Sequence, residues 1–208
     1  MDELPEFKRT ALEVLRQPME ERHVTISRAK NTIEYPAAFM LIAAMNPCPC
    51  GYYNHPTVEC TCPPGAVRRY LNKVSGPLMD RIDLHIEVTP VPVAELGKAL
   101  PSESSAVIRE RVLAARAIQT ERFKSNPMVH CNAQMTSKLT RQHCVLSDQC
   151  RTIMETAMNR LGLSARAYDR ILRVARTIAD LDNSKEIKDY HLQEAITYRS
   201  LDRDNWGK

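Results

Sequence analysis

Glycine is scarce in this sequence, and its scarcity excludes two common kinds of nucleotide site. The 208 residues include only six glycines, and none has the spacing G-x-x-x-x-G-K-[ST] or G-x-G-x-x-G. These two patterns mark the P-loop and the dinucleotide-binding fold, in which glycine backbones approach phosphate groups closely. The sequence therefore contains no glycine-rich loop that could hold the phosphates of a nucleotide.

Long apolar runs and an export signal are missing as well. No apolar run approaches the roughly 18 residues of a membrane-spanning helix, and the acidic start, Met1–Glu6, differs from the basic start of a secretory signal. Because the seven cysteines are an odd number, we expect reduced thiols or metal ligands, not a disulfide framework. We therefore expect a cytoplasmic protein without a membrane partner. The formal charge of +4 permits a polyanionic partner but does not by itself indicate one.

The first half of the sequence has the pattern of an α/β fold. Val24–Arg28 and Thr32–Tyr35 alternate in hydropathy around Ala29–Asn31, which predicts a β-hairpin with basic residues at its tip. Phe39–Met45 is a continuous apolar run, typical of a strand buried on both faces of a parallel sheet. Ile82–Val88 alternates and predicts a second strand.

The second half has the pattern of helices only. Three prolines between residues 90 and 101 mark the change. Apolar spacing then predicts helices over 104–123, 148–161 and 165–181, and a last helix capped by Asp189. We therefore expect two domains, a partial parallel sheet with helices at 1–96 and an all-helical domain at 97–208.

Two cysteine pairs lie in an irregular, proline-rich stretch. Cys48 and Cys50 are separated from Cys60 and Cys62 by nine residues. Four thiolates can close a tetrahedral Zn²⁺ site, which would stabilise a loop with little core of its own. The C-x-C spacing differs from the common C-x₂₋₄-C, so four reduced structural thiols are the alternative.

Polar residues near the predicted strands could serve nucleotide chemistry. Asp2 and Glu3 are paired carboxylates of the kind that hold Mg²⁺ and activate water, or they form a charge pair at a helix start. Asn46 could position water against a phosphate, or it could end a strand ahead of Pro47. Arg81 precedes a predicted strand and could reach a neighbouring subunit as an arginine finger, or pair with a nearby aspartate.

Two further groups of basic residues have the same two interpretations. Arg166, Arg170 and Arg173 recur at helical spacing, and Arg28 and Lys30 lie at the predicted hairpin tip. Each group could contact phosphate, of a nucleotide or of a nucleic acid. Each could equally be a solvated surface.

Together and in this order, these segments resemble one family. The chain resembles the C-terminal part of the Mg-chelatase-like AAA+ ATPases, and within them the competence-related ComM/YifB branch. The matching segments are Asp2–Phe7, Val24–Arg28, Ala43–Gly51 and Ser75–Leu84, with Leu163–Arg166 and Ile171–Arg176 resembling the family's helical lid.

The resemblance implies a role for each candidate residue. Asp2 and Glu3 correspond to the Walker B pair, Asn46 to sensor 1 and Arg81 to the arginine finger. Arg166 corresponds to sensor 2, with Arg173 as a second candidate for nucleotide contact. Arg28 and Lys30 correspond to the pre-sensor 1 hairpin, which faces DNA in related helicases, and the four cysteines match the branch's pattern for zinc.

The resemblance also implies a function for the parent protein. It predicts a hexameric, ATP- and Mg²⁺-dependent DNA helicase or branch-migration motor of recombination or competence. The alternatives are a non-enzymatic, zinc-stapled DNA- or protein-binding module, and a chelatase motor subunit for insertion of Mg²⁺ into a porphyrin. Because family members carry a P-loop ahead of the position of Asp2, we expect this chain alone neither to hydrolyse ATP nor to bind it tightly. Sheet strands missing from it would leave an edge open to self-association.

Overall fold

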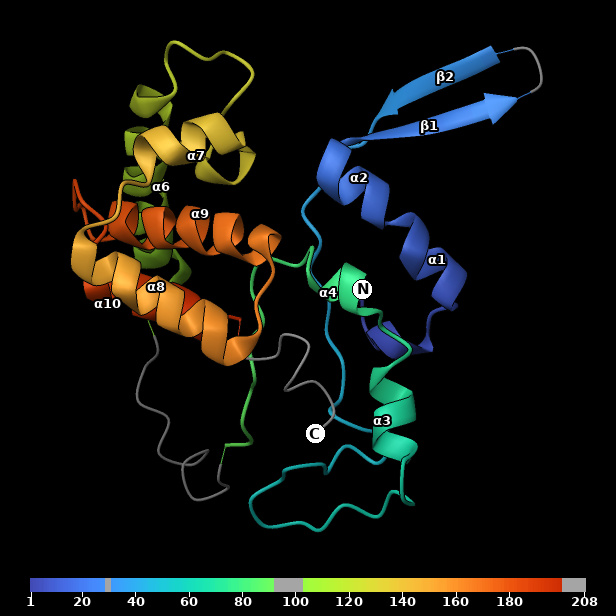
Figure 1. The fold of residues 1–208 in the computed structure, drawn as a ribbon. Coiled ribbons are helices and arrows are strands. Elements are labelled where there is room, and N and C mark those ends of the chain that lie inside the picture. Colours follow the sequence, from blue (N-terminus) through green and yellow to red (C-terminus); the bar gives the residue numbers. More distant parts are fainter. Residues whose placement is uncertain (29–30, 92–102, 200–208) are drawn as a thin grey trace. The chain divides into compact units, whose positions relative to one another are not determined.

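A computed structural model of the chain describes residues 1–28, 31–91 and 103–199 (Figure 1). The chain divides into two compact units, Met1–Ile82 and Asp83–Leu201. The domain boundary expected after residue 96 lies outside the described residues.

The N-terminal unit consists of short helices and one hairpin. Its elements are η1 (Leu4–Glu6), α1 (Arg9–Val14), α2 (Arg16–Glu21), β1 (His23–Arg28), β2 (Asn31–Pro36), α3 (Ala66–Leu71) and α4 (Gly76–Met79). Pro18 lies in the first turn of α2. A proline is tolerated there because its missing N–H would have no partner within the helix.

The hairpin is confirmed. β1 and β2 pair antiparallel, with Ser27 opposite Thr32 and Arg28 opposite Asn31. The hydroxyls of Ser27 and Thr32 lie 3.2 Å apart and form a cross-strand hydrogen bond. Residues 29–30 lie outside the described residues. In Figure 1 the hairpin extends away from the end of α2, which leaves the residues of β2 exposed to solvent.

The expected parallel sheet is not formed within the described residues, where the hairpin is the only sheet. Phe39–Met45 has no regular secondary structure, and Met40 is 81% exposed. An apolar run becomes a buried strand only when other strands pair with it, and this run pairs briefly with Met1–Leu4. Ile82–Val88 likewise forms no strand, because the His85 N–H donates to the carbonyl oxygen of Tyr198 instead of to a ladder.

The C-terminal unit is helical, as predicted. Its elements are α6 (Ser105–Arg122), η2 (Asn132–Gln134), α7 (Ser137–His143), α8 (Asp148–Leu161), α9 (Ala165–Leu181) and α10 (Asp189–Thr197). The helices expected over 104–123, 148–161 and 165–181 are confirmed to within one residue at each end. α9 contacts α6, α7, α10 and η2, so it forms the centre of this unit (Figure 1).

Helix caps explain these boundaries. The hydroxyl of Ser164 accepts a hydrogen bond from the Ala167 N–H at the start of α9. Gly162 ends α8 in the left-handed conformation, with φ of 60°. At α10 the prediction was wrong by one residue, because Lys188 is the N-cap and Asp189 is the first helical residue.

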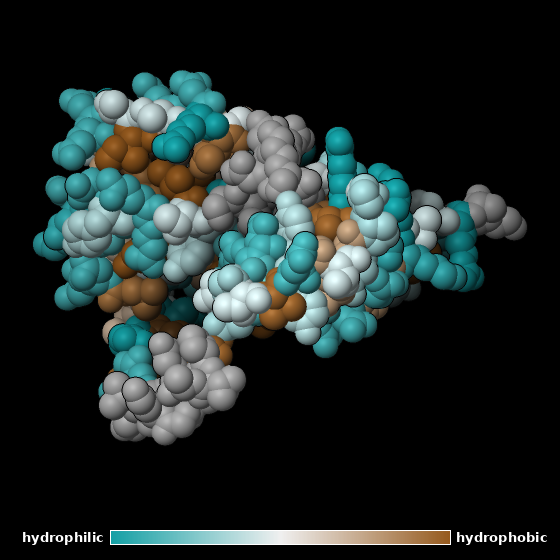
Figure 2. All heavy atoms as spheres, turned by 90° about the horizontal axis from the view of Figure 1, so that it is seen from below, coloured by the Kyte–Doolittle hydropathy of each residue, from teal (hydrophilic) through white to brown (hydrophobic). Residues whose placement is uncertain are grey.

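Each unit has its own hydrophobic core. The small core of the N-terminal unit is formed by Leu4, Leu12, Val74, Leu78 and Met79. The larger core of the C-terminal unit is centred on α9, with Ile171, Ala175 and Ala179 fully buried. Apolar side chains also reach the surface, where they appear as brown spheres in Figure 2. None of the helices in the described part of the chain is both long enough and apolar enough to cross a membrane.

Candidate functional site

The four cysteines of the irregular loop converge on one point. The Sγ atom of Cys48 lies 3.3 Å from that of Cys50 and 3.8 Å from that of Cys60, and the latter two are 3.5 Å apart. With Cys62 included, all four sulfurs lie within 4.8 Å of one another. These distances exceed the length of a disulfide bond, and all four cysteines are free thiols.

Backbone N–H groups donate hydrogen bonds to sulfurs of this cluster, and such bonds favour the thiolate form. The Tyr53 N–H donates to Cys48 Sγ at 3.3 Å. The Tyr52 N–H, with further donors, lowers the pKa of the Cys50 thiol to about 5. At Cys62 the Cys50 N–H acts in the same direction, but desolvation and the neighbouring thiols outweigh it and raise the pKa to about 12. Cys50 therefore loses its proton at a lower pH than Cys62 does.

The geometry fits a tetrahedral metal ion. A Zn–S distance of about 2.3 Å in a tetrahedron places sulfurs about 3.8 Å apart, close to the separations found here. The turn that brings Cys48 and Cys50 together requires Gly51, whose φ of 83° is disfavoured for other residues. The other three cysteines lie in the C-terminal unit. Cys144 and Cys150 are buried in its core, where burial raises the pKa of Cys144 to about 12.

Backbone pairing joins the segment of the predicted nucleotide residues Asp2 and Glu3 to the segment that leads to Asn46. The N–H of Met1 donates to the Ile42 carbonyl at 2.7 Å, and the Ala44 N–H donates back to the Met1 carbonyl at 2.9 Å. This reciprocal pattern is that of parallel strands. A third bond, from the Leu4 N–H to the Ala44 carbonyl at 3.1 Å, extends the pairing past Asp2 and Glu3.

Glu3 has an unusual backbone conformation at this position. Its φ of 49° lies in the left-handed region, which a residue with a side chain adopts at an energetic cost. The carboxylate of Asp2 accepts the Glu3 N–H at 2.9 Å and stabilises the turn. Both carboxylates, and the side chain of Asn46, remain exposed to solvent. They are therefore open to a metal ion or a phosphate.

Tyr70 on α3 connects these residues to the cysteine cluster, and sequence analysis did not identify it. Its side chain is buried, and its hydroxyl accepts a hydrogen bond from the backbone N–H of Asn46. Burial, and then the charges of Glu6, Glu3 and Cys48, raise the pKa of Tyr70. A buried tyrosine needs a partner for its hydroxyl, but the sequence gives no indication of which group supplies it.

Arg81 lies in the N-terminal unit with its guanidinium turned inward. Nη2 and Nε donate to Glu20 Oε2 at 2.6 and 3.0 Å, and Nη1 donates to the Pro77 carbonyl at 2.6 Å. The side chain is only 7% exposed. Glu20 is thus the partner in its ion pair, whereas the sequence suggested Asp80 or Asp83. Contact with a neighbouring subunit would require Arg81 to leave Glu20.

The three arginines of α9 that the sequence singled out differ in their surroundings. Arg166 is exposed near the start of the helix. Arg170 forms an ion pair with Asp83 and is 13% exposed, and Arg173 donates to Thr140 Oγ1 at 3.4 Å. Burial lowers the pKa of Arg173. The interpretation of these arginines as a solvated surface is therefore wrong for Arg170 and Arg173.

The basic hairpin tip is described only in part. Arg28 is the last residue of β1 and is exposed. Lys30 lies outside the described residues. The roles predicted for these two residues, and for the candidate nucleotide residues above, stay predictions.

Two family models match the chain. The model described as magnesium chelatase, subunit ChlI, matches residues 1–96. The model described as magnesium chelatase, subunit ChlI C-terminal, matches residues 102–199. The matches together reach from one end of the described residues to the other.

Curated relatives match most of the chain. An uncharacterized protein of Escherichia coli, YifB, and the competence protein ComM of Haemophilus influenzae are each 46% identical over 204 residues. This match covers 98% of the chain but 39% of each relative. An uncharacterized protein of Mycobacterium tuberculosis is 36% identical over 181 residues, which is 87% of the chain and 35% of that protein.

The chain thus spans about two fifths of the length of the relatives YifB and ComM. Both halves of the chain match models of the same family, and the alignment with YifB covers almost the whole chain. The chain belongs to the magnesium chelatase subunit ChlI family, on the branch that includes YifB and ComM.

Proposed function

We propose that this chain is the C-terminal portion of an AAA+ motor that uses ATP hydrolysis to act on DNA. The observation that supports the proposal is the backbone pairing of Met1–Leu4 with residues 42–44, because it joins the segment of Asp2 and Glu3 to the segment that leads to Asn46. Acidic residues and a polar amide on paired segments are groups that nucleotide hydrolysis requires. The family match supports the same motor class.

Each residue has a distinct task in this proposal. The Asp2 carboxylate would hold Mg²⁺, which neutralises phosphate charge when it is bound. Glu3 would accept a proton from the attacking water, and the Asn46 amide would orient that water. Arg81 and Arg166 would contact the γ-phosphate from a neighbouring subunit and from the lid, with Arg173 as a further nucleotide contact.

The roles of the carboxylates can be tested in a chimera of E. coli YifB whose matching segment is replaced by this chain. We expect Glu3→Gln to abolish ATP hydrolysis while ATP binding is retained, because the substitution removes a proton acceptor and no phosphate ligand. Glu110→Gln, an exposed acid on α6, is the control. Normal hydrolysis by the E3Q chimera would contradict the assignment.

DNA is the proposed substrate. The exposed Arg28 at the end of a projecting hairpin supports it, as does the name competence protein of the H. influenzae relative. We expect this chain to bind fluorescein-labelled single-stranded DNA with an affinity that falls steeply with salt. Arg28→Ala should weaken binding severalfold in fluorescence anisotropy, whereas Arg141→Ala, on α7, should not. Salt-independent or undetectable binding would refute the DNA role.

We also propose that Cys48, Cys50, Cys60 and Cys62 hold a structural Zn²⁺. Their sulfurs have the separations of a tetrahedral site, and four thiolates leave no open position for catalysis. When bound, the ion would supply charge neutralisation and a crosslink between the two ends of the loop. The pairing of Asn46 with Tyr70 adjoins this crosslink, so the metal would also stabilise the sensor segment.

Elemental analysis tests the metal site directly. We expect purified protein to contain a single zinc ion per chain, and the double variant Cys48→Ser/Cys60→Ser to contain none. Cys131→Ser is the matched control, since this half-buried thiol belongs to the other unit. Chelation should lower the urea concentration that unfolds the N-terminal unit. Zinc-free protein of unchanged stability would refute the site.

Two alternative functions follow from particular observations. The cysteine cluster favours a non-enzymatic, metal-stapled module that binds DNA or protein. The family models favour a chelatase motor, whose partner inserts Mg²⁺ into a porphyrin. DNA-stimulated ATP hydrolysis by the chimera would exclude the non-enzymatic module. Salt-dependent DNA binding would argue against the chelatase motor.

A further inference from the structure

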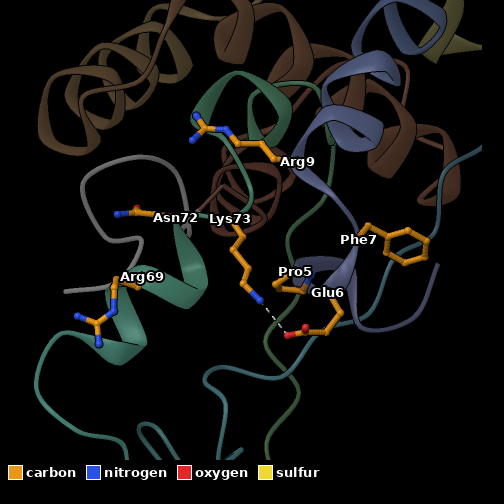
Figure 3. A pocket seen from close by; sticks show the side chains of 7 residues that line it. All are labelled: Pro5, Glu6, Phe7, Arg9, Arg69, Asn72 and Lys73. Carbon is orange, nitrogen blue, oxygen red and sulfur yellow. Dashed lines mark hydrogen bonds and ion pairs between the residues drawn. The ribbon is translucent and has the colours of Figure 1, made fainter.

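A cavity of about 500 Å³ opens on the N-terminal unit, and neither the cysteines nor the hairpin residues are among those that line it. It is lined by residues from two regions, Pro5–Phe7 with Arg9 and the segment that contains Arg69, Asn72 and Lys73 (Figure 3). Three of the seven lining residues are cationic and one, Glu6, is acidic. None of the roles assigned above involves this cavity.

The donors of the cavity are arranged in a row. In Figure 3 the side chains of Arg9, Asn72 and Arg69 present their nitrogen atoms on the same side, with the Asn72 amide between the two guanidinium groups. Arg9 belongs to α1, whereas Arg69 lies on α3 and Asn72 directly follows it. Two separate elements therefore contribute donors to the same cavity.

These donors are open to an external ligand. All three side chains are exposed, and within the described residues none of them forms a hydrogen bond or an ion pair with another side chain. Lys73 differs, because its Nζ pairs with Glu6 at 3.1 Å. The carboxylate of Glu13 is held by Ser75 and Arg16, and Arg9 contributes least to lowering its pKa. The charges of Arg9 and Arg69 are therefore little neutralised.

The sequence around α3 strengthens the positive potential. Arg68, Arg69 and Lys73 occur between Cys60 and Met79, a stretch without a single Asp or Glu. Guanidinium groups bind phosphate oxygens through pairs of N–H donors, and an amide adds a neutral donor between them. A row of such donors along a concave surface suits a chain of phosphates more than one isolated anion.

We propose that Arg9, Asn72 and Arg69 form a binding site for the phosphodiester backbone of single-stranded nucleic acid. The site rests on the proposed DNA function and adds a second contact to that of the hairpin. A flexible single strand can enter a cavity of this size, whereas a duplex presents its phosphates on a convex surface. Because phosphate oxygens carry no sequence information, the contact would be independent of base sequence.

Fluorescence anisotropy with labelled oligothymidylate tests the site. We expect Arg9→Ala/Arg69→Ala to weaken binding about tenfold at low salt and to reduce the slope of log K against log salt by about 1.4, since each lost phosphate contact accounts for about 0.7. Arg9→Lys/Arg69→Lys should retain most of the affinity, because it keeps both charges. The matched control is Arg109→Ala/Arg116→Ala, which removes two exposed arginines from α6.

The outcomes separate this inference from the proposed function. If the R9A/R69A variant binds like the parent while R28A is weakened, the cavity is not a binding site and the DNA function stands. If the parent does not bind DNA, both fail. Equal weakening by the α6 control, or displacement of the oligonucleotide by micromolar ATP, would also overturn the inference. Unchanged circular dichroism of each variant establishes that the fold is intact.

Discussion

Asp180 connects more side chains than sequence analysis could have indicated. Its carboxylate accepts hydrogen bonds from Arg122 Nη1 at 2.6 Å, Asn132 Nδ2 at 2.7 Å and Arg176 Nε at 3.1 Å. The side chain is completely buried. A buried carboxylate that faces two guanidinium groups holds three separate segments of the C-terminal unit together, α6, η2 and α9.

Removal of this charge should destabilise the C-terminal unit strongly. Asp180→Asn leaves two guanidinium groups without a counter-charge, which in buried sites costs about 3–5 kcal/mol. Urea denaturation followed by far-ultraviolet circular dichroism measures the loss. Glu155→Gln, an exposed acid on α8, should change stability by less than about 0.5 kcal/mol. A D180N variant as stable as this control would show that the ion pairs of Asp180 make no net contribution to the free energy of unfolding.

His143 at the end of α7 makes the same unit sensitive to pH. Burial, and then the charges of Arg122 and Arg176, lower its pKa below the ordinary value. The folded state therefore binds fewer protons than the unfolded state, and stability falls as pH drops below about 6.5. We expect the urea midpoint of unfolding to change less between about pH 7 and pH 5 in the His143→Asn variant than in the parent. If the urea midpoint of the variant depends on pH as strongly as that of the parent, another group causes the pH dependence.

At the scale of elements, the junction of α8 and α9 depends on two neighbouring caps. Gly162 has a φ of 60° and Ser164 caps the following helix. Gly162→Ala should destabilise the C-terminal unit by about 1 kcal/mol, because alanine enters the left-handed region at a cost. Asparagine tolerates this conformation better, so Gly162→Asn should lose less in the same urea titration. A G162A variant at least as stable as G162N would contradict this explanation.

The same junction shows which elements a sequence determines locally. A helix with an apolar stripe and a cap at each end has its bounds in its own residues, so α8 and α9 were predicted to the residue. A strand has half of its determinants on another segment. Phe39–Met45 has the apolar character of a buried strand, but the described residues offer it only the short pairing with Met1–Leu4.

At the scale of the whole molecule, the candidate site combines features that a local sequence pattern predicts with contacts between distant segments that it does not predict. The C-x-C pairs indicated a metal centre, and the structure brings their sulfurs within 4.8 Å of one another. The pairing of Arg81 with Glu20 and that of Tyr70 with Asn46 join distant segments, and no local pattern predicts them. Resemblance to a family suggested roles for particular polar residues, whereas their contacts required the structure.

The same residues also determine what this chain can do by itself. In the proposed function, Asp2, Glu3, Asn46 and Arg166 would act on the metal, the water and the γ-phosphate, but most of the affinity for a nucleotide would come from the backbone amides and the lysine of a P-loop. The sequence of this chain contains no such loop. Isothermal titration with MgATP should therefore detect no tight binding, and no hydrolysis should follow. Micromolar affinity would show that the exposed carboxylates and arginines suffice, and would contradict the assignment of this chain as one portion of a divided nucleotide site.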